Sequence, residues 1–147
     1  LSPDVTTLGP AENYQLKPAM TLKAKLALVK FAPEGSAVGY GGTVVLKRAT
    51  HLGLVVMGYS DGIPRNTSAM AGVTSHEKKA PIVGRVSMDQ FVVDLGEKTE
   101  SVAGEYVTIF GSGTANYSID EWAAAANTIN YEIVTRIASR VERIYVN

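Results

Sequence analysis

Tyr40 lies in a run of glycines, and this setting makes its phenol the first candidate for chemistry. The stretch AVGYGGT, residues 37–43, places three glycines around this one large side chain. Glycine beside a strand commonly marks a turn or a close approach of another group to the backbone. A tyrosine acts as a base only when cations or donated hydrogen bonds lower the pKa of its phenol from about 10. From this stretch alone, a ring that covers an edge of the core is the favoured explanation.

A second tyrosine stands where an apolar segment runs into a loop. In MGYSDGIPR, Tyr59 ends the apolar segment and Arg65 follows an Asp-Gly turn. Binding and catalytic residues gather on loops of this kind. Taken by itself, the stretch is explained more simply as a plain turn after a buried strand.

Two opposite charges lie close together in GRVSMDQF. Arg85 and Asp89 flank a short strand-like segment that holds Met88. The pattern fits a binding edge and the polar face of an edge strand equally well, so the residues alone leave both interpretations open.

Tyr131 opens a predicted helix, NYEIVTRIAS, where free backbone N–H groups favour anions. A phenol at this point could help to hold a phosphate group. An aromatic ring packed beneath the helix explains the same residue more simply, and it is the favoured interpretation without other observations.

The histidines do not form a metal-binding pattern. His51 starts an apolar segment and His76 lies in HEKKA, which predicts a solvated turn; neither has companions at metal-ligand spacing. The chain has no cysteine, which excludes disulfides and thiolate sites and permits a reducing compartment. No Ser-His-Asp motif, P-loop or GxGxxG fingerprint occurs. The sequence therefore predicts no metal site.

Composition predicts one globular domain with a sizeable core. Of 147 residues, 46% are hydrophobic and 19% charged. Fourteen basic and fourteen acidic residues cancel, which argues against nucleic acid or an anionic membrane as the main partner. No apolar run approaches the roughly 18 residues that a membrane helix needs.

Short apolar segments bounded by turns predict strands at close intervals, as in a barrel or sandwich. Residues 20–31 alternate apolar and polar side chains, which is typical of a half-buried strand. Residues 32–42 and 60–72 are predicted loops. Further strands are predicted over 43–50, 51–59, 79–88, 89–96, 104–111 and 141–147.

Two short helices are predicted near the C-terminus. Residues 118–127 begin with Ser118, followed three positions later by Glu121, which is a capping-box pattern before an alanine run. Residues 130–139 begin with Asn130 as a candidate cap. The predicted fold class is therefore mainly β, a small β-barrel or sandwich-like domain with two short helices near its C-terminus.

Five stretches, taken in order and spacing, resemble the C-terminal β-domain of alanine racemase: KPAMTLKAKL, VGYGGT, MGYSDGIPR, PIVGRVSMDQ and TINYEIVTRI. The likeness runs from Lys17 to Val146. In this family the subunit begins with a (β/α)8 barrel that carries pyridoxal phosphate on a lysine. The resemblance implies that residues 1–18 are a linker from such a barrel and that 19–147 form the C-terminal β-domain.

The resemblance also implies an activity. Members interconvert L- and D-alanine in the cytoplasm and supply D-alanine for peptidoglycan, using one base on each face of the substrate. One base is the cofactor's lysine, and the tyrosine of the Gly-rich loop, which matches Tyr40, is the other. It acts in the active site of the partner subunit of a homodimer, against that subunit's barrel. The 147 residues alone are expected to be inactive.

Other positions match the family's site residues. Met88 resembles the residue whose backbone N–H receives the substrate carboxylate, with Asp89 beside it as an active-site acid. Tyr59 resembles a tyrosine of the substrate pocket, and Tyr131 one that bonds the cofactor phosphate. Three residues resemble those of the substrate entryway: Arg65, Arg85 and Ile129.

The sequence departs from the family at a few positions. Gly39 and Ser60 stand where serine and alanine are common, respectively, and none of the eight lysines lies in a recognisable cofactor-attachment context. Two other interpretations stay open: a broad-specificity amino-acid or serine racemase, or a decarboxylase of related plan, and a non-catalytic β-domain that dimerises or binds a partner.

Overall fold

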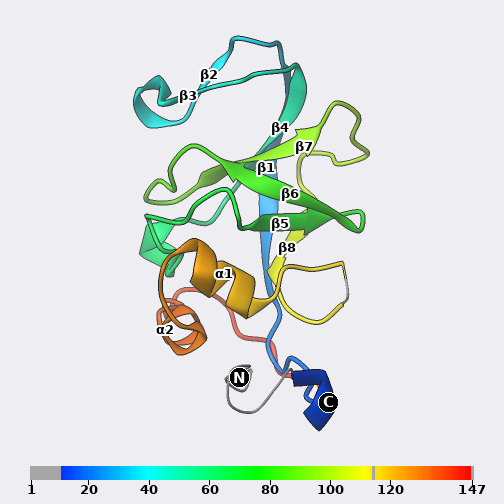
Figure 1. Cartoon of the computed structure of the whole chain (residues 1–147), viewed down its shortest axis with the longest axis vertical. Coiled ribbons are helices and arrows are strands. Elements are labelled where there is room, and N and C mark those ends of the chain that lie inside the picture. The colour runs from blue at the N-terminus through cyan, green and yellow to red at the C-terminus, as the bar shows by residue number, and fades with distance from the viewer. Residues whose placement is uncertain (1–10, 114, 147) are drawn as a thin grey trace.

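The alternating stretch near the N-terminus forms β1, Leu22–Ala32, whose inward side chains begin with Leu22, Ala24 and Leu26. The lysines between them are exposed. The computed structural model describes residues 11–113 and 115–146, and β1 runs through the middle of it (Figure 1). The sequence pattern therefore predicted this strand and its buried face correctly.

Six antiparallel strands close into a barrel around this buried face. The N-terminal half of β1 pairs with β8 and its C-terminal half with β4, so β1 joins the two sides of the barrel. The mainly β fold class is confirmed. The strands follow in the order β1, β4 (Thr50–Val55), β7 (Phe91–Gly96), β6 (Lys78–Val83), β5 (Gly72–Ser75) and β8 (Tyr106–Phe110).

The barrel strand β5 was not predicted from the sequence. All four residues of β5 are buried, so this short segment shows no alternation, and its first residue had been assigned to a loop. A two-residue turn joins β5 to β6, and both turn residues, His76 and Glu77, have positive φ angles of 46° and 61°. The predicted turn in HEKKA is thus the tip of a β-hairpin.

Other strand predictions were too long or wrong. The predicted strand over 43–50 shrinks to β3, Val44–Val45, which pairs with β2, Ala37–Val38, in a small ribbon outside the barrel. The strand predicted over 79–88 ends at Val83, because Gly84 takes a positive φ of 82°. Residues 141–146 form no strand, since a closed barrel offers them no free edge.

Both predicted helices are present, with one cap misassigned. In α1, Ile119–Ala125, Ser118 and Glu121 form the predicted capping box. In α2, Asn130–Thr135, the capping position is Ile129 rather than Asn130. Asn130 donates its side-chain amide to Asp120 instead, at 2.9 Å. No helix in the described part of the chain is both long and apolar enough to cross a membrane.

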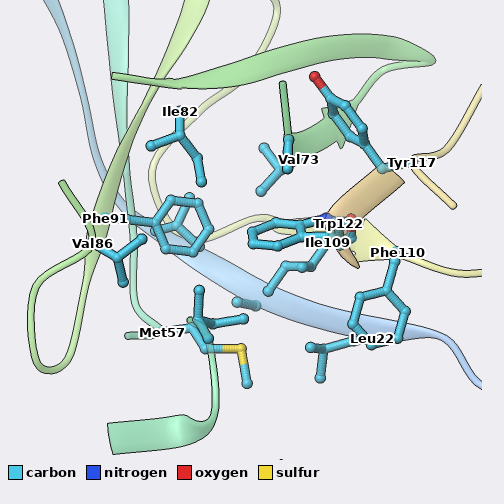
Figure 2. Packing of buried hydrophobic residues seen from close by; sticks show 14 of the residues in the cluster. Leu22, Met57, Val73, Ile82, Val86, Phe91, Ile109, Phe110, Tyr117 and Trp122 are labelled. Atoms are coloured by element: carbon cyan, nitrogen blue, oxygen red, sulfur yellow. Dashed lines mark hydrogen bonds between the residues drawn. The ribbon is translucent and has the colours of Figure 1, made fainter. Parts of the chain in front are cut away.

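Trp122 of α1 centres the main core (Figure 2). It is fully buried, donates its indole N–H to the carbonyl of Ile109 at 2.8 Å and meets the Phe91 ring edge-on. A separate, smaller cluster of Ala32, Val38, Leu46 and Leu52 fastens the β2–β3 ribbon to the barrel. The ribbon is therefore attached through few side chains.

Candidate functional site

The loop that carries Tyr40, residues 39–43 and here called the tyrosine loop, follows β2 and contains a short 3-10 helix, Tyr40–Gly42. Gly39, Gly41 and Gly42 have φ angles of 84°, 76° and 62°, which glycine adopts without strain. A Cβ added to Gly41 would meet no other atom within 4 Å. The side chain of Tyr40 lies outside the part of the chain that the structure describes.

The tyrosine loop abuts the loop between β6 and β7. A Cβ on Gly39 would lie 3.5 Å from the Cα of Gly84 and 3.8 Å from the backbone nitrogen of Arg85. This close backbone approach puts the predicted base next to the segment that holds Arg85 and Met88. In Figure 1 the tyrosine loop, the β6–β7 loop and the turn at 59–61 follow one another down one side of the molecule, above α2.

A second 3-10 helix, Tyr59–Asp61, fits against the β6–β7 loop. The backbone N–H groups of Tyr59 and Ser60 donate to the carbonyls of Ser87 and Met88 at 3.0 and 2.9 Å. Any side chain at Gly58 would overlap the Met88 carbonyl, since its Cβ would come within 2.5 Å of that carbonyl carbon. The fold therefore places the Tyr59 and Met88 segments next to each other.

One guanidinium joins this pair of segments to the chain beyond α2. Arg140 donates Nε–H to Asp61 at 2.7 Å and an Nη2–H to Asp89 at 3.0 Å. It also bonds to the hydroxyl of Ser60, which lies 2.7 Å from the Met88 carbonyl and 2.8 Å from Asp89. We call this assembly the hub: residues 58–62, residues 87–89 and Arg140.

The charges of the hub stabilise one another. Hydrogen bonds from Ser60 and then from Arg140 lower the pKa of Asp89 below its usual value of 3.8. Hydrogen bonds to Asp61 and Asp89 raise the pKa of Arg140 above its ordinary range. Asp89 is thus a carboxylate and Arg140 a cation throughout the neutral range.

The charge pair suggested by the sequence is not formed. Asp89 pairs with Arg140, and Arg85 is exposed without a hydrogen bond or ion pair in the described residues. Arg65 is exposed in the same way, with no such contact in the described range. Both guanidinium groups are therefore available to a ligand or to another part of a larger assembly.

The remaining predicted residues are exposed. Met88 and Tyr131 are each 54% exposed, and Ile129 is 64% exposed, which is high for apolar side chains. The chain just after α2 is attached to the hub, because Ala138 donates its N–H to the Asp61 carbonyl at 3.0 Å. No direct contact joins Tyr131 to the hub among the described residues.

The backbone N–H of Met88 has no hydrogen-bond acceptor in the part of the chain that the structure describes. Around it, Ser87 donates to the Gln90 carbonyl at 2.9 Å, and the Met88 carbonyl accepts from Ser60. A backbone donor on an exposed residue of a well-fixed loop can bind a carboxylate.

Residues 19–145 match the family model described as alanine racemase, C-terminal domain. The chain belongs to this family. The alanine racemase of Streptomyces coelicolor is 49% identical to it over 141 residues, which cover 95% of this chain and 36% of that protein. This racemase domain therefore spans little more than a third of that relative's length.

Solved structures show the same kinship. The alanine racemase of Streptomyces lavendulae superimposes with a TM-score of 0.92 at 48% identity, covering 100% of this chain and 38% of that one. The alanine racemase of Bartonella henselae, solved with covalently bound pyridoxal phosphate, gives 0.77 at 31% identity, covering 86% and 34%.

Sequence reasoning missed the residue that ties this racemase domain's hub together. Arg140 lies 79 positions from Asp61 and 51 from Asp89, so no local spacing points to it. Asp61 was identified only as part of a turn, and Ser60 only as a departure from the family's common alanine. The cluster becomes visible when the barrel places the three segments together.

Other polar features of the racemase domain lie away from this site. His51 approaches the Gly96 carbonyl at 3.3 Å, and His76 bonds to Glu105 at 3.2 Å. The described residues contain no group of three or more side chains that could hold a metal ion. A hollow of about 400 Å³ between β5 and β8 is lined by His76, Glu105 and their neighbours, and it includes none of the predicted site residues.

Proposed function

We propose that this chain is the C-terminal domain of a pyridoxal-phosphate-dependent alanine racemase, which interconverts L- and D-alanine and so supplies D-alanine for peptidoglycan. The observation that carries the proposal is the juxtaposition of the tyrosine loop with the hub. The glycine-supported tyrosine loop abuts the start of the β6–β7 loop, and that loop carries the Met88 N–H, which has no acceptor among the described residues. The Tyr40 phenol can move a proton while the Met88 N–H holds the substrate.

Tyr40 is proposed as one of the two bases. Inverting a stereocentre through a flat intermediate requires a proton to leave one face and another to arrive on the opposite face, and a phenol can serve as both acceptor and donor. The pKa of the phenol must fall toward neutrality, which cations supplied by a neighbouring barrel would achieve. The open surroundings of Gly41 suit a loop that enters another subunit.

The hub is proposed to bind the amino acid. The Met88 N–H would donate to the substrate carboxylate, a role that requires position rather than side-chain chemistry. Tyr59, 39% exposed and bonded through its backbone to Ser87, would form the wall beside it. Asp89 stays ionised and is compensated by Arg140, so it need not repel the carboxylate.

The cofactor fits this chain at one point only. When bound, pyridoxal phosphate supplies the electron-accepting ring that makes the substrate's α-proton acidic. The Tyr131 hydroxyl would hold the phosphate, because it lies on a half-exposed ring and makes no hydrogen bond within the described residues. No lysine of the described residues bonds to the hub, so the attachment lysine would belong to a barrel domain.

The entryway residues would favour small amino acids and attract their carboxylate group. Arg65 and Arg85 present unpaired guanidinium groups that attract a carboxylate, and Ile129 adds an exposed apolar wall. A homodimer, in which each β-domain faces the other subunit's barrel, would complete this passage.

The test is a chimera in which this chain replaces the matched segment of the Streptomyces coelicolor racemase. We expect the chimera to racemise alanine, and we expect the 147-residue chain with added pyridoxal phosphate to show no turnover. In the chimera, Tyr40→Phe should slow racemisation by about 10²–10⁴-fold.

Exchange of the α-proton with deuterated solvent gives the deciding result. Tyr40→Phe should slow exchange selectively for one enantiomer, because the other enantiomer still meets the second base. Racemisation must fall equally in both directions, since the equilibrium between mirror images cannot change. Equal loss of exchange for both enantiomers, with the cofactor still bound, would show that the phenol has only a structural role.

A further inference from the structure

We propose that Arg140 is a positioning residue for catalysis: its guanidinium holds the Met88–Asp89 backbone so that the Met88 N–H stays in place for the substrate carboxylate. This inference rests on the proposed function of Met88. Arg140 touches neither the reacting atoms nor the proposed carboxylate site directly. Its effect would pass through Asp89 and Ser60.

The geometry makes Arg140 a bridge between segments that are distant in sequence. Its Nε–H bonds to Asp61 in the 3-10 helix at 2.7 Å, and its Nη2–H bonds to Asp89 in the β6–β7 loop at 3.0 Å. The second carboxylate oxygen of Asp61 accepts the N–H of Gly58 at 2.9 Å. Both ends of the bridge are therefore fixed to backbone next to Tyr59 and Met88.

The backbone that carries Arg140 is itself secured. Ala138 donates to the Asp61 carbonyl at 3.0 Å, and Arg143 donates to the Ile137 carbonyl at 3.0 Å. Ile137 is buried in the main core. The guanidinium is thus presented from a fixed support and acts as a brace on the β6–β7 loop.

A guanidinium suits this task better than an ammonium group. Its planar set of donors can meet Asp61 and Asp89 at once, in a fixed geometry, and still reach the Ser60 hydroxyl. The single proton of that hydroxyl can be given to the Met88 carbonyl or to Asp89. Arg140 is therefore linked to Asp89 directly and to the Met88 carbonyl through the Ser60 hydroxyl.

The bridge is better suited to setting position than to adding stability. In the link to Asp89 the two side chains are 55% and 62% exposed, and ion pairs at such exposure contribute little to folding. The Asp61 side chain is only 14% exposed, but it keeps the Gly58 N–H as a partner when Arg140 is removed. The rest of the hub is fixed by backbone hydrogen bonds and by the fit at Gly58. Loss of Arg140 should therefore loosen one loop without unfolding the barrel.

The experiment measures steady-state kinetics of the chimera with Arg140→Ala. We expect the KM for alanine to rise about tenfold while kcat stays within about twofold, because a binding interaction is weakened equally in the ground and transition states. Asp89→Ala should also raise KM. Adding Arg140→Ala to Asp89→Ala should then raise KM by less than Arg140→Ala does alone, because the Arg140–Asp89 contact is already lost and only the link through Ser60 remains.

Arg136→Ala is the matched control. Arg136 has a side chain 53% exposed that pairs with Glu132 one turn earlier, and among the described residues this side chain makes no hydrogen bond or ion pair with the hub. The KM of the Arg136→Ala chimera should equal that of the unsubstituted chimera. If Arg140→Ala does not yield folded enzyme, Ser60→Ala removes one link and should raise KM about threefold, a smaller effect because alanine is common here in the family.

The outcomes separate the two proposals. A chimera that racemises alanine, with a Tyr40 effect but an unchanged KM in Arg140→Ala, contradicts the positioning role alone. A lower kcat at constant KM contradicts it as well. A chimera with no racemase activity, or one indifferent to Tyr40→Phe, contradicts the proposed function first.

Discussion

The tyrosine loop and the hub lie side by side but are held in different ways. Around Gly41 there is open space, whereas Gly58 is enclosed by the carbonyls of Ser87 and Met88. The loop depends on a ribbon with two residues in each strand and on a cluster of four buried apolar residues. The hub depends on backbone hydrogen bonds and a shared guanidinium. The contrast is consistent with the proposed roles: the proposed base lies on a lightly packed loop, and the proposed carboxylate donor lies on a tightly packed one.

Replacing one glycine in each region by alanine should change the free energy of unfolding by very different amounts, and this is the largest expected difference between the two regions. Gly58→Ala forces a Cβ into the Met88 carbonyl and should lower the free energy of unfolding by about 3 kcal/mol, as overpacking does. Gly41→Ala meets no atom, so only its left-handed φ of 76° opposes the change, at about 1 kcal/mol.

Urea unfolding of the 147-residue chain, followed by the fluorescence of Trp122, would measure both values, because this single tryptophan is fully buried. Equal losses at Gly58 and Gly41 would mean that the two regions are packed alike.

The attachment of the tyrosine loop can be weakened without touching the hub. Val38→Ala removes two buried methyl groups from the small apolar cluster and should cost about 1.5 kcal/mol. The Leu46 N–H, which bonds to the Ser36 carbonyl, should lose about tenfold of its hydrogen-exchange protection. The Ser60 N–H in the hub should keep its protection.

Val45→Ala is the control for this change, because Val45 lies in the same ribbon and is 58% exposed. Its substitution should leave the exchange of Leu46 nearly unchanged. Loss of protection at Ser60 in Val38→Ala would show that the two regions form one cooperative unit.

Lowering the pH should weaken the hub by protonating Asp89 and should not affect the tyrosine loop. This is the smallest of the three expected effects. The pKa of Asp89 is lowered below 3.8 by hydrogen bonds from Ser60 and Arg140, so the stabilisation is complete above 3.8 and lost as pH falls through the lowered pKa. A carbon NMR titration of the carboxyl should show this, and Arg140→Ala should raise the pKa back toward 3.8. An unchanged pKa in Arg140→Ala would mean that the guanidinium does not bond to Asp89 in solution.

The sequence predicted best those parts of the fold that local patterns determine. The alternation in β1 and the Ser118 capping box both appear as expected, because each depends on neighbours within a few residues. The all-buried β5 has no such pattern, and Ile144, Tyr145 and Val146 stay exposed because the barrel closes without them. Strand pairing is a long-range property, and it overrode local propensity at both places.

In the candidate site, too, residues in local motifs could be predicted and a residue that depends on long-range contacts could not. Tyr59, Met88 and Asp89 were singled out from local motifs and from the family resemblance, and the structure brings them together. Arg140 was not found, because nothing near it in sequence distinguishes it from the exposed Arg136. Its role depends on which distant carboxylates the fold places within its reach.

Closure of the barrel has a consequence for the behaviour of the domain outside a larger enzyme. Because β1 is paired on both sides, the six barrel strands have no free edge to which another chain could add a strand. The β2–β3 ribbon is different, because each of its two strands pairs only with the other. Edge-to-edge association, and any growth into fibrils, would therefore begin beside Tyr40, on the segment whose backbone is covered least by its own chain.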